Sequence, residues 1–587
     1  MTRTYGEAAF NAETRRWELT KVEPHVVGRL KRVFSRIDIA RSDLFRFHDE
    51  PAQCSELVWF MMRYPMVMSR ADRAYLAKRD REFEALKDAC EQILLPDWKP
   101  GPLTGLKEGV EIRRYQSKAM SLLGVKKGLL LGDDVGLGKT HPAMAFLATH
   151  PGALPAAVVV EPNLVRQWKR RIEETTHLRV HVVDSTKPYS LPVDCDVVIF
   201  RYSNILGWGP VAKEGVFKTV IYDEIQSLRR GRESSKGQAC WEFSKMAEYR
   251  LGLSATPVYG YGIEIFNIIS FLFPFDKPLG TREEFVREWC SGGEQKVRDP
   301  DALGAFLREH HLMLRRTKAD EEIRAELAYA LVGDRINRVP IEVPYDEGEE
   351  KRVEALARTL AIKTVSGSFM ERGKAARDLD MLLRQSTGVA KAKGVADLVA
   401  MLLESGRERV VLAGWHRDVI DIWKRELARF KPVLYTGSEG AKQKNASEDS
   451  FVTGDSRVLI ISLGSGAGLD SLQACCNTLV VGELPWSRAV THQLEGRLDR
   501  DGQTSDIIDS FITFCDSGSD PAIMELMGLK AAQAKGISDP YAEVEFVQQD
   551  EGRITAMART WLQRRGLEIP APTKPESRVE ERQLELV

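Results

Sequence analysis

Two series of compact apolar runs, separated by helical stretches, predict an α/β protein with two doubly wound parallel sheets. The first series lies between residues 106 and 260 and consists of KGLLLGDD, AAVVVEPN, CDVVIFRYS, KTVIYDE and YRLGLSATP. The second begins near residue 407 and consists of RERVVLAGW, FKPVLYTG, SRVLIISLGSG, CNTLVVGE and SDIIDSFITF. Each run ends in polar or small residues, which is typical of a buried strand that leads into a loop.

The length and composition fit a multidomain globular protein. The chain has 587 residues, of which 43% are hydrophobic and 29% charged, so a length prior suggests roughly four domains and not a disordered chain. The sequence has no apolar run of about 18 residues and no secretory signal, so we expect no membrane association. The eight cysteines show no metal-ligand spacing, which favours reduced thiols. Because the net charge is −1, nucleic-acid binding would depend on local basic patches.

Changes in composition along the chain predict five segments. The first hundred residues indicate a small α+β domain, because TYGEAAF and RRWELT flank a turn-like NAET and a charged helical run follows. LLPDWKPGPLTG is rich in Pro and Gly and indicates a linker. The predicted segments are an accessory domain at 1–105 that recognises DNA substrates, a first lobe at 106–260, helical protrusions and a linker at 261–395, a second lobe at 396–520, and a C-terminal helical extension with a mobile tail at 521–587.

The segment LLLGDDVGLGKT, residues 129–140, combines an apolar strand, a glycine-rich turn and a helix start. Backbone N–H groups of such a turn, together with the helix N-terminus, bind phosphate oxygens. Gly136 and Gly138 belong to this turn, Lys139 would reach the β- and γ-phosphates, and Thr140 would bind Mg²⁺. Asp133 stands where the strict motif has its first glycine. The alternative is a plain glycine turn.

Two further elements would complete an ATP site. The strand in KTVIYDEIQ ends at Asp223, which would hold Mg²⁺, and Glu224, which would polarise the attacking water. In HQLEGRLDRDGQ, Arg497 and Arg500 lie three residues apart and so share one face of a predicted helix. Arginines that approach the γ-phosphate from a second lobe contribute about 10³–10⁵ in rate. The alternative for this segment is the solvated charged face of a helix.

In chain order the sequence contains RRYQ, GDDVGLGKT, EPNLVRQW, DEIQ, LSATP, LMLRRTK, SLGSGAGLDSLQ and QLEGRLDRDGQ. This series resembles the SWI/SNF-type DNA translocases of helicase superfamily 2, and residues 382–404 resemble their annealing-helicase branch. The resemblance implies two RecA-like lobes, and it departs from the usual pattern at DEIQ, LSATP and Asp470. The resemblance implies that Gln116, beside Tyr115, recognises adenine and that Gly468 and Gln493 line the interlobe cleft. It also implies that four residues couple the ATP state to DNA: Gln226, Ser254, Ala255 and Thr256.

Three basic clusters accompany these motifs, one after EPN, one after DEIQ and one in LMLRRTK. Contacts from such side chains to DNA phosphates give an affinity that depends on salt and not on base sequence. Each cluster taken alone fits solvated surface equally well, and Trp168 fits a core anchor or a stacking platform. We predict DNA contacts for Arg166, Arg170, Arg230, Arg316 and Lys318.

The motifs together predict a motor that uses ATP and Mg²⁺ to translocate on double-stranded or forked DNA. It would remodel forks, junctions or protein–DNA complexes, as DNA repair requires. The alternative is a strand-separating superfamily 2 DNA or RNA helicase, which LSATP favours and LRRTK disfavours; a non-hydrolysing scaffold would need none of the catalytic residues. We expect a monomer in the cytoplasm of a bacterial or phage-infected cell, with other proteins as further candidate partners of the N-terminal domain.

Overall fold

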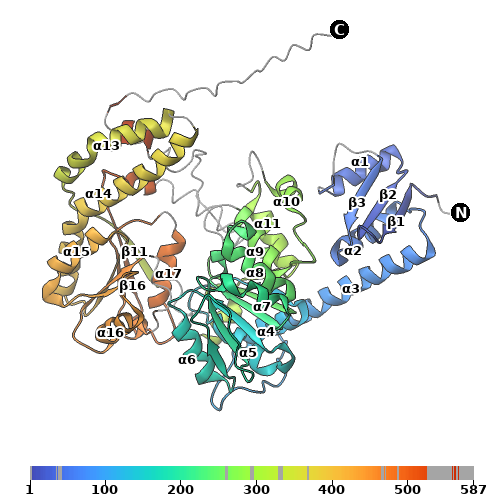
Figure 1. Cartoon of the computed structure of the whole chain (residues 1–587), viewed down its shortest axis with the longest axis horizontal. Helices are drawn as coiled ribbons and strands as arrows, with labels where there is room; N and C mark the ends of the chain where they lie inside the picture. Colours follow the sequence, from blue (N-terminus) through green and yellow to red (C-terminus); the bar gives the residue numbers. More distant parts are fainter. Residues whose placement is uncertain are drawn as a thin grey trace, which may run out of the picture. The chain divides into compact units, whose positions relative to one another are not determined.

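A computed structural model shows the chain as two compact units, divided between residues 334 and 335 (Figure 1). None of the described helices is long and apolar enough to cross a membrane, and all eight cysteines are free thiols. The structure describes residues 3–34, 36–37, 43–257, 262–290, 297–327, 335–366, 369–463, 469, 471–485, 488–524, 558–559, 561–563 and 566–567.

The N-terminal part of the first unit is a three-stranded antiparallel sheet with two helices. The strands β1 (Glu7–Asn11), β2 (Arg16–Thr20) and β3 (Leu44–His48) pair in that order. Trp17 and Phe47 anchor its core, which α1 (Pro24–Val33) and α2 (Pro51–Arg63) cover. The turn-like NAET does join β1 to β2. The third strand, LFRFH, was not expected, because α1 separates it from β2 and no tight turn marks the pairing.

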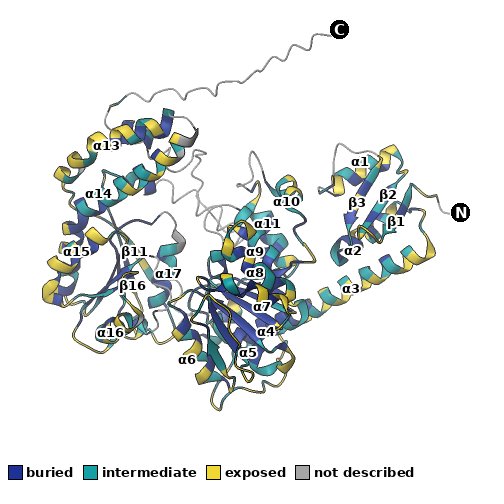
Figure 2. Ribbon diagram, in the orientation of Figure 1, coloured by how far each residue is buried: buried dark blue, intermediate teal, exposed yellow. Residues whose placement is uncertain are grey.

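The helix α3 (Arg70–Leu94) leads from this sheet to the first lobe. Ser69 caps it, since its hydroxyl accepts the backbone N–H of Asp72 at 3.0 Å. Figure 2 shows mostly exposed and half-buried residues along α3, whereas the sheet of the lobe is dark blue. The N-terminal domain also contacts α10 (Arg282–Trp289), where Arg36 pairs with Glu288 at 2.6 Å and His48 with Glu284 at 3.2 Å.

The first lobe is a seven-stranded parallel sheet in the order β10-β4-β9-β8-β5-β7-β6. All five predicted apolar runs are strands in it, and they are buried because helices cover both faces of the sheet. The strands are β4 (Gly128–Leu131), β5 (Ala156–Val160), β6 (Val180–Val182), β7 (Val197–Arg201), β8 (Thr219–Asp223), β9 (Tyr249–Leu253) and β10 (Met313–Leu314). The helices, besides α10, are α4 (Arg114–Lys126), α5 (Thr140–Thr149), α6 (Val165–Thr175), α7 (Gly209–Lys213), α8 (Ser235–Met246), α9 (Ile263–Leu272), α11 (Pro300–Glu309) and α12 (Glu321–Glu326).

The second unit is a six-stranded parallel sheet in the order β11-β16-β15-β12-β14-β13. The five runs of the second predicted series are all strands, so the predicted α/β class with two doubly wound lobes is confirmed. The strands are β11 (Ile336–Glu342), β12 (Val410–Gly414), β13 (Val433–Tyr435), β14 (Val458–Ser462), β15 (Thr478–Val481) and β16 (Ile508–Phe514). The helices are α13 (Glu347–Ser366), α14 (Phe369–Glu404), α15 (Arg417–Glu426), α16 (Ala441–Val452) and α17 (Arg488–Leu498).

The segment 261–395, expected to be mainly helical, also contains β10 and β11. The strand β10 extends the first sheet beside β4, and β11 extends the second beside β16. Both are edge strands. The strand β10 is only two residues long, and β11 is half-buried or exposed, so neither has the long apolar run by which buried strands are recognised. Most of the predicted C-terminal segment 521–587 lies outside the described residues.

Candidate nucleotide-binding site

The glycine-rich turn between β4 and α5 has the backbone geometry of a phosphate-binding loop. Gly136 and Gly138 adopt φ of 85° and 70°, a left-handed region in which a side chain would be strained. A Cβ on Gly138 would also lie 2.9 Å from Nδ1 of His141 and 3.0 Å from Nε2 of Gln116. The turn ends where Thr140 opens α5, so backbone N–H groups and a helix N-terminus meet at one place, as anion binding requires.

Lys139 is held inside this loop. Its ammonium donates to the backbone carbonyl oxygens of Asp133 at 2.8 Å and Asp134 at 3.1 Å. Burial lowers the pKa of Lys139, and the charge of Glu224 partly opposes that effect. A cation with few water contacts gains more from an anion beside it than an exposed one does. Lys139 therefore stands where a phosphate group would stabilise it.

Asp133, the residue that departs from the strict phosphate-loop motif, is buried and paired. Arg316 donates to its carboxylate through Nε at 3.0 Å and through the terminal nitrogen Nη2 at 2.5 Å. Arg316 also donates to the backbone carbonyl of Tyr115 and lies over the Tyr115 ring at 5.0 Å. Because Arg316 is 7% exposed and bound inside the lobe, we correct the prediction that it contacts DNA. In this structure Arg316 binds Asp133 and Tyr115 inside the first lobe.

Asp223 and Glu224 lie at the carboxyl end of β8, as predicted. The Asp223 carboxylate accepts the backbone N–H of Glu224 at 3.0 Å and the indole N–H of Trp168 at 2.6 Å. Burial raises the pKa of Asp223 to about 6, with a further contribution from the charge of Glu224. Glu224 adopts φ 50° and ψ 51°, a strained conformation for a residue with a side chain. Gln226 donates a hydrogen bond to its carboxylate.

Gln116 and Tyr115, on the first turn of α4, contact the middle of the phosphate loop. The Tyr115 hydroxyl donates to the carbonyl of Leu137 at 2.9 Å, and Nε2 of Gln116 lies 3.3 Å from the same oxygen. The other end of the Gln116 amide caps α4, where Oε1 accepts the backbone N–H of Arg113 at 3.1 Å. Both side chains are buried. The structure thus shows a link to the loop, while adenine recognition by Gln116 stays a prediction.

The LSATP segment that follows β9 lies beside the phosphate loop. The backbone N–H of Ser254 donates to the carbonyl of Leu131 at 3.1 Å, and the Ser254 hydroxyl accepts the N–H of Thr256 at 3.0 Å. Arg315 donates to the carbonyls of Gly132 at 2.6 Å and Ala255 at 3.3 Å. Arg315 was predicted as a member of a basic cluster for DNA but not as a neighbour of the phosphate loop. Its position in LMLRRTK, among other basic residues, was the only signal in the sequence.

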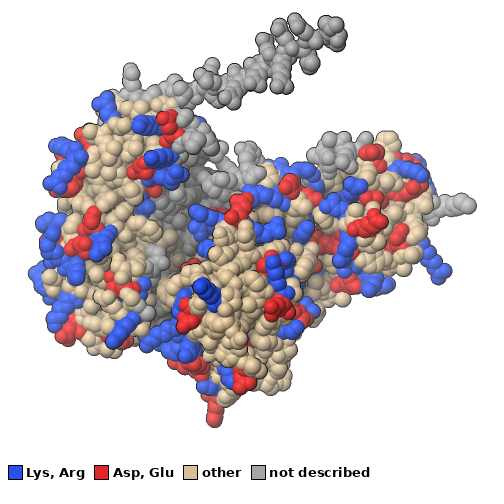
Figure 3. All heavy atoms as spheres, viewed as in Figure 1, with Lys and Arg blue, Asp and Glu red and all other residues tan. Residues whose placement is uncertain are grey.

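The remaining predicted DNA contacts lie at the surface of the first lobe. Arg166 and Arg170 are exposed on α6, where ion pairs join Lys169 to Glu173 and Arg170 to Glu174. Figure 3 shows side chains of both signs over this region. Lys318 is half-buried after β10. These four contacts, Arg166, Arg170, Arg230 and Lys318, stay predictions.

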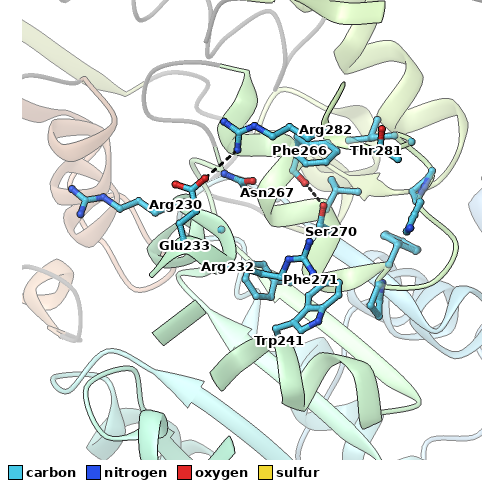
Figure 4. Close-up of a pocket in the computed structure, with 18 of the residues that line it drawn as sticks. Arg230, Arg232, Glu233, Trp241, Phe266, Asn267, Ser270, Phe271, Thr281 and Arg282 are labelled. Atoms are coloured by element: carbon cyan, nitrogen blue, oxygen red, sulfur yellow. Dashed lines mark hydrogen bonds and ion pairs between the residues drawn. The ribbon is translucent and has the colours of Figure 1, made fainter. Parts of the chain in front are cut away.

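Arg230 lines a hollow of about 790 Å³ between the loop after β8 and helices α8 and α9. Figure 4 shows Arg230, Arg232 and Arg282 among the side chains that line it. The guanidinium of Arg232 lies 4.4 Å from the ring centroid of Trp241, and Arg282 pairs with Glu233 at 3.6 Å. The hollow is separate from the phosphate loop, and its mixed charges give no single ligand class.

In the second unit, the two predicted arginine fingers occupy different local structure. Arg497 lies on α17, whereas Arg500 lies two residues beyond the end of α17 and donates through Nε to the carbonyl of Gly496 at 2.8 Å. The acidic residues next to these arginines are not a solvated face: Glu495 and Asp499 are buried and pair with Arg338 and Arg335, respectively. Gln493 is half-buried on α17, and Gly468 and Asp470 lie outside the described residues.

A comparison with protein-family models matches the part of the chain that contains the phosphate loop and Asp223. Residues 52–329 match the model of the SNF2-related domain, which includes the second half of the predicted accessory domain. The chain is 23% identical over 423 residues to the SWI/SNF-related matrix-associated actin-dependent regulator of chromatin subfamily A-like protein 1 homolog of Caenorhabditis elegans, covering 68% of this chain and 58% of that protein. It is 23% identical over 494 residues to the DNA annealing helicase and endonuclease ZRANB3 of Homo sapiens, covering 81% and 43%.

The chain thus spans about half the length of these curated relatives. Among solved structures, the Sulfolobus solfataricus SWI2/SNF2 ATPase core in complex with dsDNA aligns with a TM-score of 0.37 and 18% sequence identity. That alignment covers 75% of this chain and 96% of the solved one.

Proposed function

Because the chain carries an SNF2-related domain, we propose that it is an ATP-hydrolysing motor that moves along double-stranded DNA. The observation that carries this proposal is the phosphate loop with its half-buried Lys139, set in the same sheet as Asp223 and Glu224. Strands β4 and β8 both flank β9 in a parallel sheet, so their carboxyl ends lie at one edge, where α/β folds bind nucleotides.

ATP would bind with its phosphates on the loop N–H groups of Gly136 and Gly138 and its γ-phosphate beside Lys139. Glu224 would orient the attacking water, since its strained backbone directs a half-buried carboxylate from the end of β8. Gln116 would read the adenine edge. In this proposal Arg497 and Arg500 stabilise the charge that develops on the γ-phosphate in the transition state.

The residues at this edge fit Mg²⁺. The Asp223 carboxylate and the Thr140 hydroxyl are the hard oxygen donors that Mg²⁺ prefers, and the charges of Asp223 and Glu224 repel each other without a cation. Among the described residues there is no group of three or more His, Cys, Asp or Glu side chains that would make a protein-only metal site. Mg²⁺ would therefore share its ligands between Asp223, Thr140, water and phosphate oxygens, and it would neutralise charge that develops on the phosphates.

DNA would be contacted by the basic side chains of the first lobe, with Arg166 and Arg170 on α6 as the first candidates. The proposed substrates are forks, junctions and annealing strands, because one relative is a DNA annealing helicase and the motif order resembles that branch. We assign substrate recognition to the N-terminal domain, whose sheet and α3 precede the motor core.

The experiment that tests the proposal is the steady-state ATPase rate without nucleic acid and with single-stranded DNA, duplex DNA, forked DNA and RNA. The proposal predicts strong stimulation by duplex or forked DNA. Stimulation by single strands or RNA alone would point to a strand-separating helicase instead. Absence of turnover under every condition would contradict the proposal.

A further inference from the structure

Helix α6 has two faces with different chemistry. Its buried face carries Val165, Trp168 and Ile172, and Trp168 is only 1% exposed. Its exposed face carries Arg166 and Arg170, the candidate contacts to DNA phosphates. The side chains on the two faces share one hydrogen-bonded backbone. A contact on the outer face that displaced α6 would therefore also displace the side chains on its inner face.

The inner face of α6 contacts the residue that would bind Mg²⁺. The indole N–H of Trp168 donates to Oδ2 of Asp223 at 2.6 Å, while Oδ1 accepts the backbone N–H of Glu224 at 3.0 Å. The two donors hold the carboxylate from both sides and fix its rotation about the Cβ–Cγ bond. An ionised carboxylate has about four lone-pair sites, so both hydrogen bonds leave capacity for a metal ion.

A second hydrogen bond joins the same two segments. The Ser227 hydroxyl, four residues after the end of β8, donates to Oε1 of Glu161, which lies between β5 and α6, at 2.5 Å. Strand β5 pairs in parallel with β8, and Val159 lies opposite Tyr222 in the register. The segment from β5 into α6 therefore contacts the chain on both sides of Glu224.

From these contacts we propose that Trp168 is a positioning residue through which DNA binding on α6 sets the Asp223 carboxylate for Mg²⁺. This inference rests on the proposed ATPase function and adds a route by which DNA stimulates it. Hydrogen-bond partners of metal-binding carboxylates contribute about 10- to 100-fold in metal affinity. A displacement of α6 by DNA contact moves the indole donor and, with it, the carboxylate oxygen that accepts its hydrogen bond.

The test compares Trp168→Phe with Trp208→Phe in the full chain. Trp208 is a matched control, because it is also fully buried in this lobe and donates one hydrogen bond, to the carbonyl of Ser185 at 3.0 Å. Binding of a fluorescent, non-hydrolysable ATP analogue is titrated with Mg²⁺, in the presence and absence of duplex DNA, and repeated in EDTA.

Trp168→Phe is expected to raise the Mg²⁺ concentration for half-maximal binding about 10- to 100-fold, while binding in EDTA stays within about twofold of wild type. Duplex DNA is expected to strengthen Mg²⁺-dependent binding in the wild type and in Trp208→Phe but not in Trp168→Phe. A merely structural role for the indole would weaken binding equally with and without metal. Wild-type Mg²⁺ dependence and wild-type DNA coupling in Trp168→Phe would overturn the inference.

If Trp168→Phe does not fold, 3-benzothienylalanine at position 168 keeps the bicyclic shape and replaces the N–H donor by sulfur. The same Mg²⁺ shift is expected for this variant, and wild-type behaviour in it would overturn the inference. If the wild-type chain hydrolyses ATP and the Trp168 variants behave as Trp208→Phe does, this inference is wrong and the proposed function still stands. If the wild-type chain neither binds nor hydrolyses ATP, the proposed function itself is contradicted.

Discussion

The Arg316 guanidinium holds the Asp133 carboxylate inside the first lobe, with a closest approach of 2.5 Å and both side chains at most 8% exposed. Asp133 begins the phosphate loop, and the backbone N–H of the next residue, Asp134, donates to the carbonyl of Arg316 at 2.9 Å. The acidic residue that departs from the strict motif is therefore balanced by an arginine from 183 positions later in the chain. The pair joins the loop to the segment that follows β10, an edge strand of the same sheet.

Replacement of Arg316 by alanine is expected to destabilise the first lobe by about 3–5 kcal/mol, because it leaves a buried carboxylate without its cation. The measurement is chemical denaturation of the full chain, following the transition that an ATP analogue shifts to higher denaturant. The control is Arg230→Ala, an exposed arginine in the same lobe, expected to change stability by less than about 0.5 kcal/mol. Equal stability of the two variants would contradict the structural role assigned to Arg316.

Arg500→Ala is expected to leave ATP affinity within a few-fold of wild type and to lower DNA-stimulated turnover by about 10³-fold or more. The reason is that a finger acts on charge that develops only in the transition state. Steady-state turnover and equilibrium binding of an ATP analogue are measured together, with Arg425→Ala as the control because Arg425 is exposed on α15 of the same unit. Near-normal turnover of Arg500→Ala would reject the finger role.

Glu50 is expected to make the protein less stable as the pH rises. Burial raises the pKa of Glu50 to about 8. The positive charges of Arg36 and Lys126 oppose this rise, whereas the negative charges of Asp276 and Glu56 add to it. Between the unfolded pKa, about 4.3, and about 8, the native chain holds a proton that the unfolded chain has lost. Stability therefore falls as pH rises through this window, by at most about 1.4 kcal/mol per pH unit from this one group.

Glu50→Gln is expected to remove this contribution, so the variant gains stability over wild type as pH rises from about 5 to about 8. Thermal unfolding of both proteins across this window measures the difference. Glu214→Gln is the control, because Glu214 is exposed on the same unit. Parallel stability curves for wild type and Glu50→Gln would show that the Glu50 carboxyl titrates normally.

Arg166→Ala is expected to weaken duplex binding to the same extent on every sequence. Loss of one phosphate contact should reduce the slope of log affinity against log salt by about 0.9. Fluorescence anisotropy at several salt concentrations measures the slope, with Lys213→Ala on α7 as an exposed control. An unchanged slope would remove Arg166 from the predicted DNA contacts.

Ten parallel strands of the two lobes were predictable because they are short apolar runs, most of them buried on two faces. The strand β6 was missed because its three residues, Val-His-Val, are only half-buried. The turn that holds Gly136 and Gly138 was also visible in the sequence, since the local backbone requires glycine there. The edge strand β11 was missed because all its residues are half-buried or exposed. Local composition does not distinguish such a strand from a loop.

Roles that depend on contacts between distant segments were not predictable from local patterns. Arg316 stands next to Arg315 and Lys318 in a basic cluster, which favoured a surface role, yet its partner Asp133 lies far earlier in the chain. For Trp168 the sequence left core and stacking roles open. The structure places it in the core and adds the hydrogen bond to Asp223, which no periodicity encodes.

The central claim, movement along intact duplex DNA, is tested most directly by displacement of a labelled third strand from a triplex that lies within a longer duplex. The proposal predicts ATP-dependent release of the third strand while the duplex strands stay paired. Lys139→Ala, which removes the ammonium at the phosphate loop, should bind the duplex but release nothing. ATP hydrolysis without third-strand release, or release only when the duplex itself is separated, would contradict the claim.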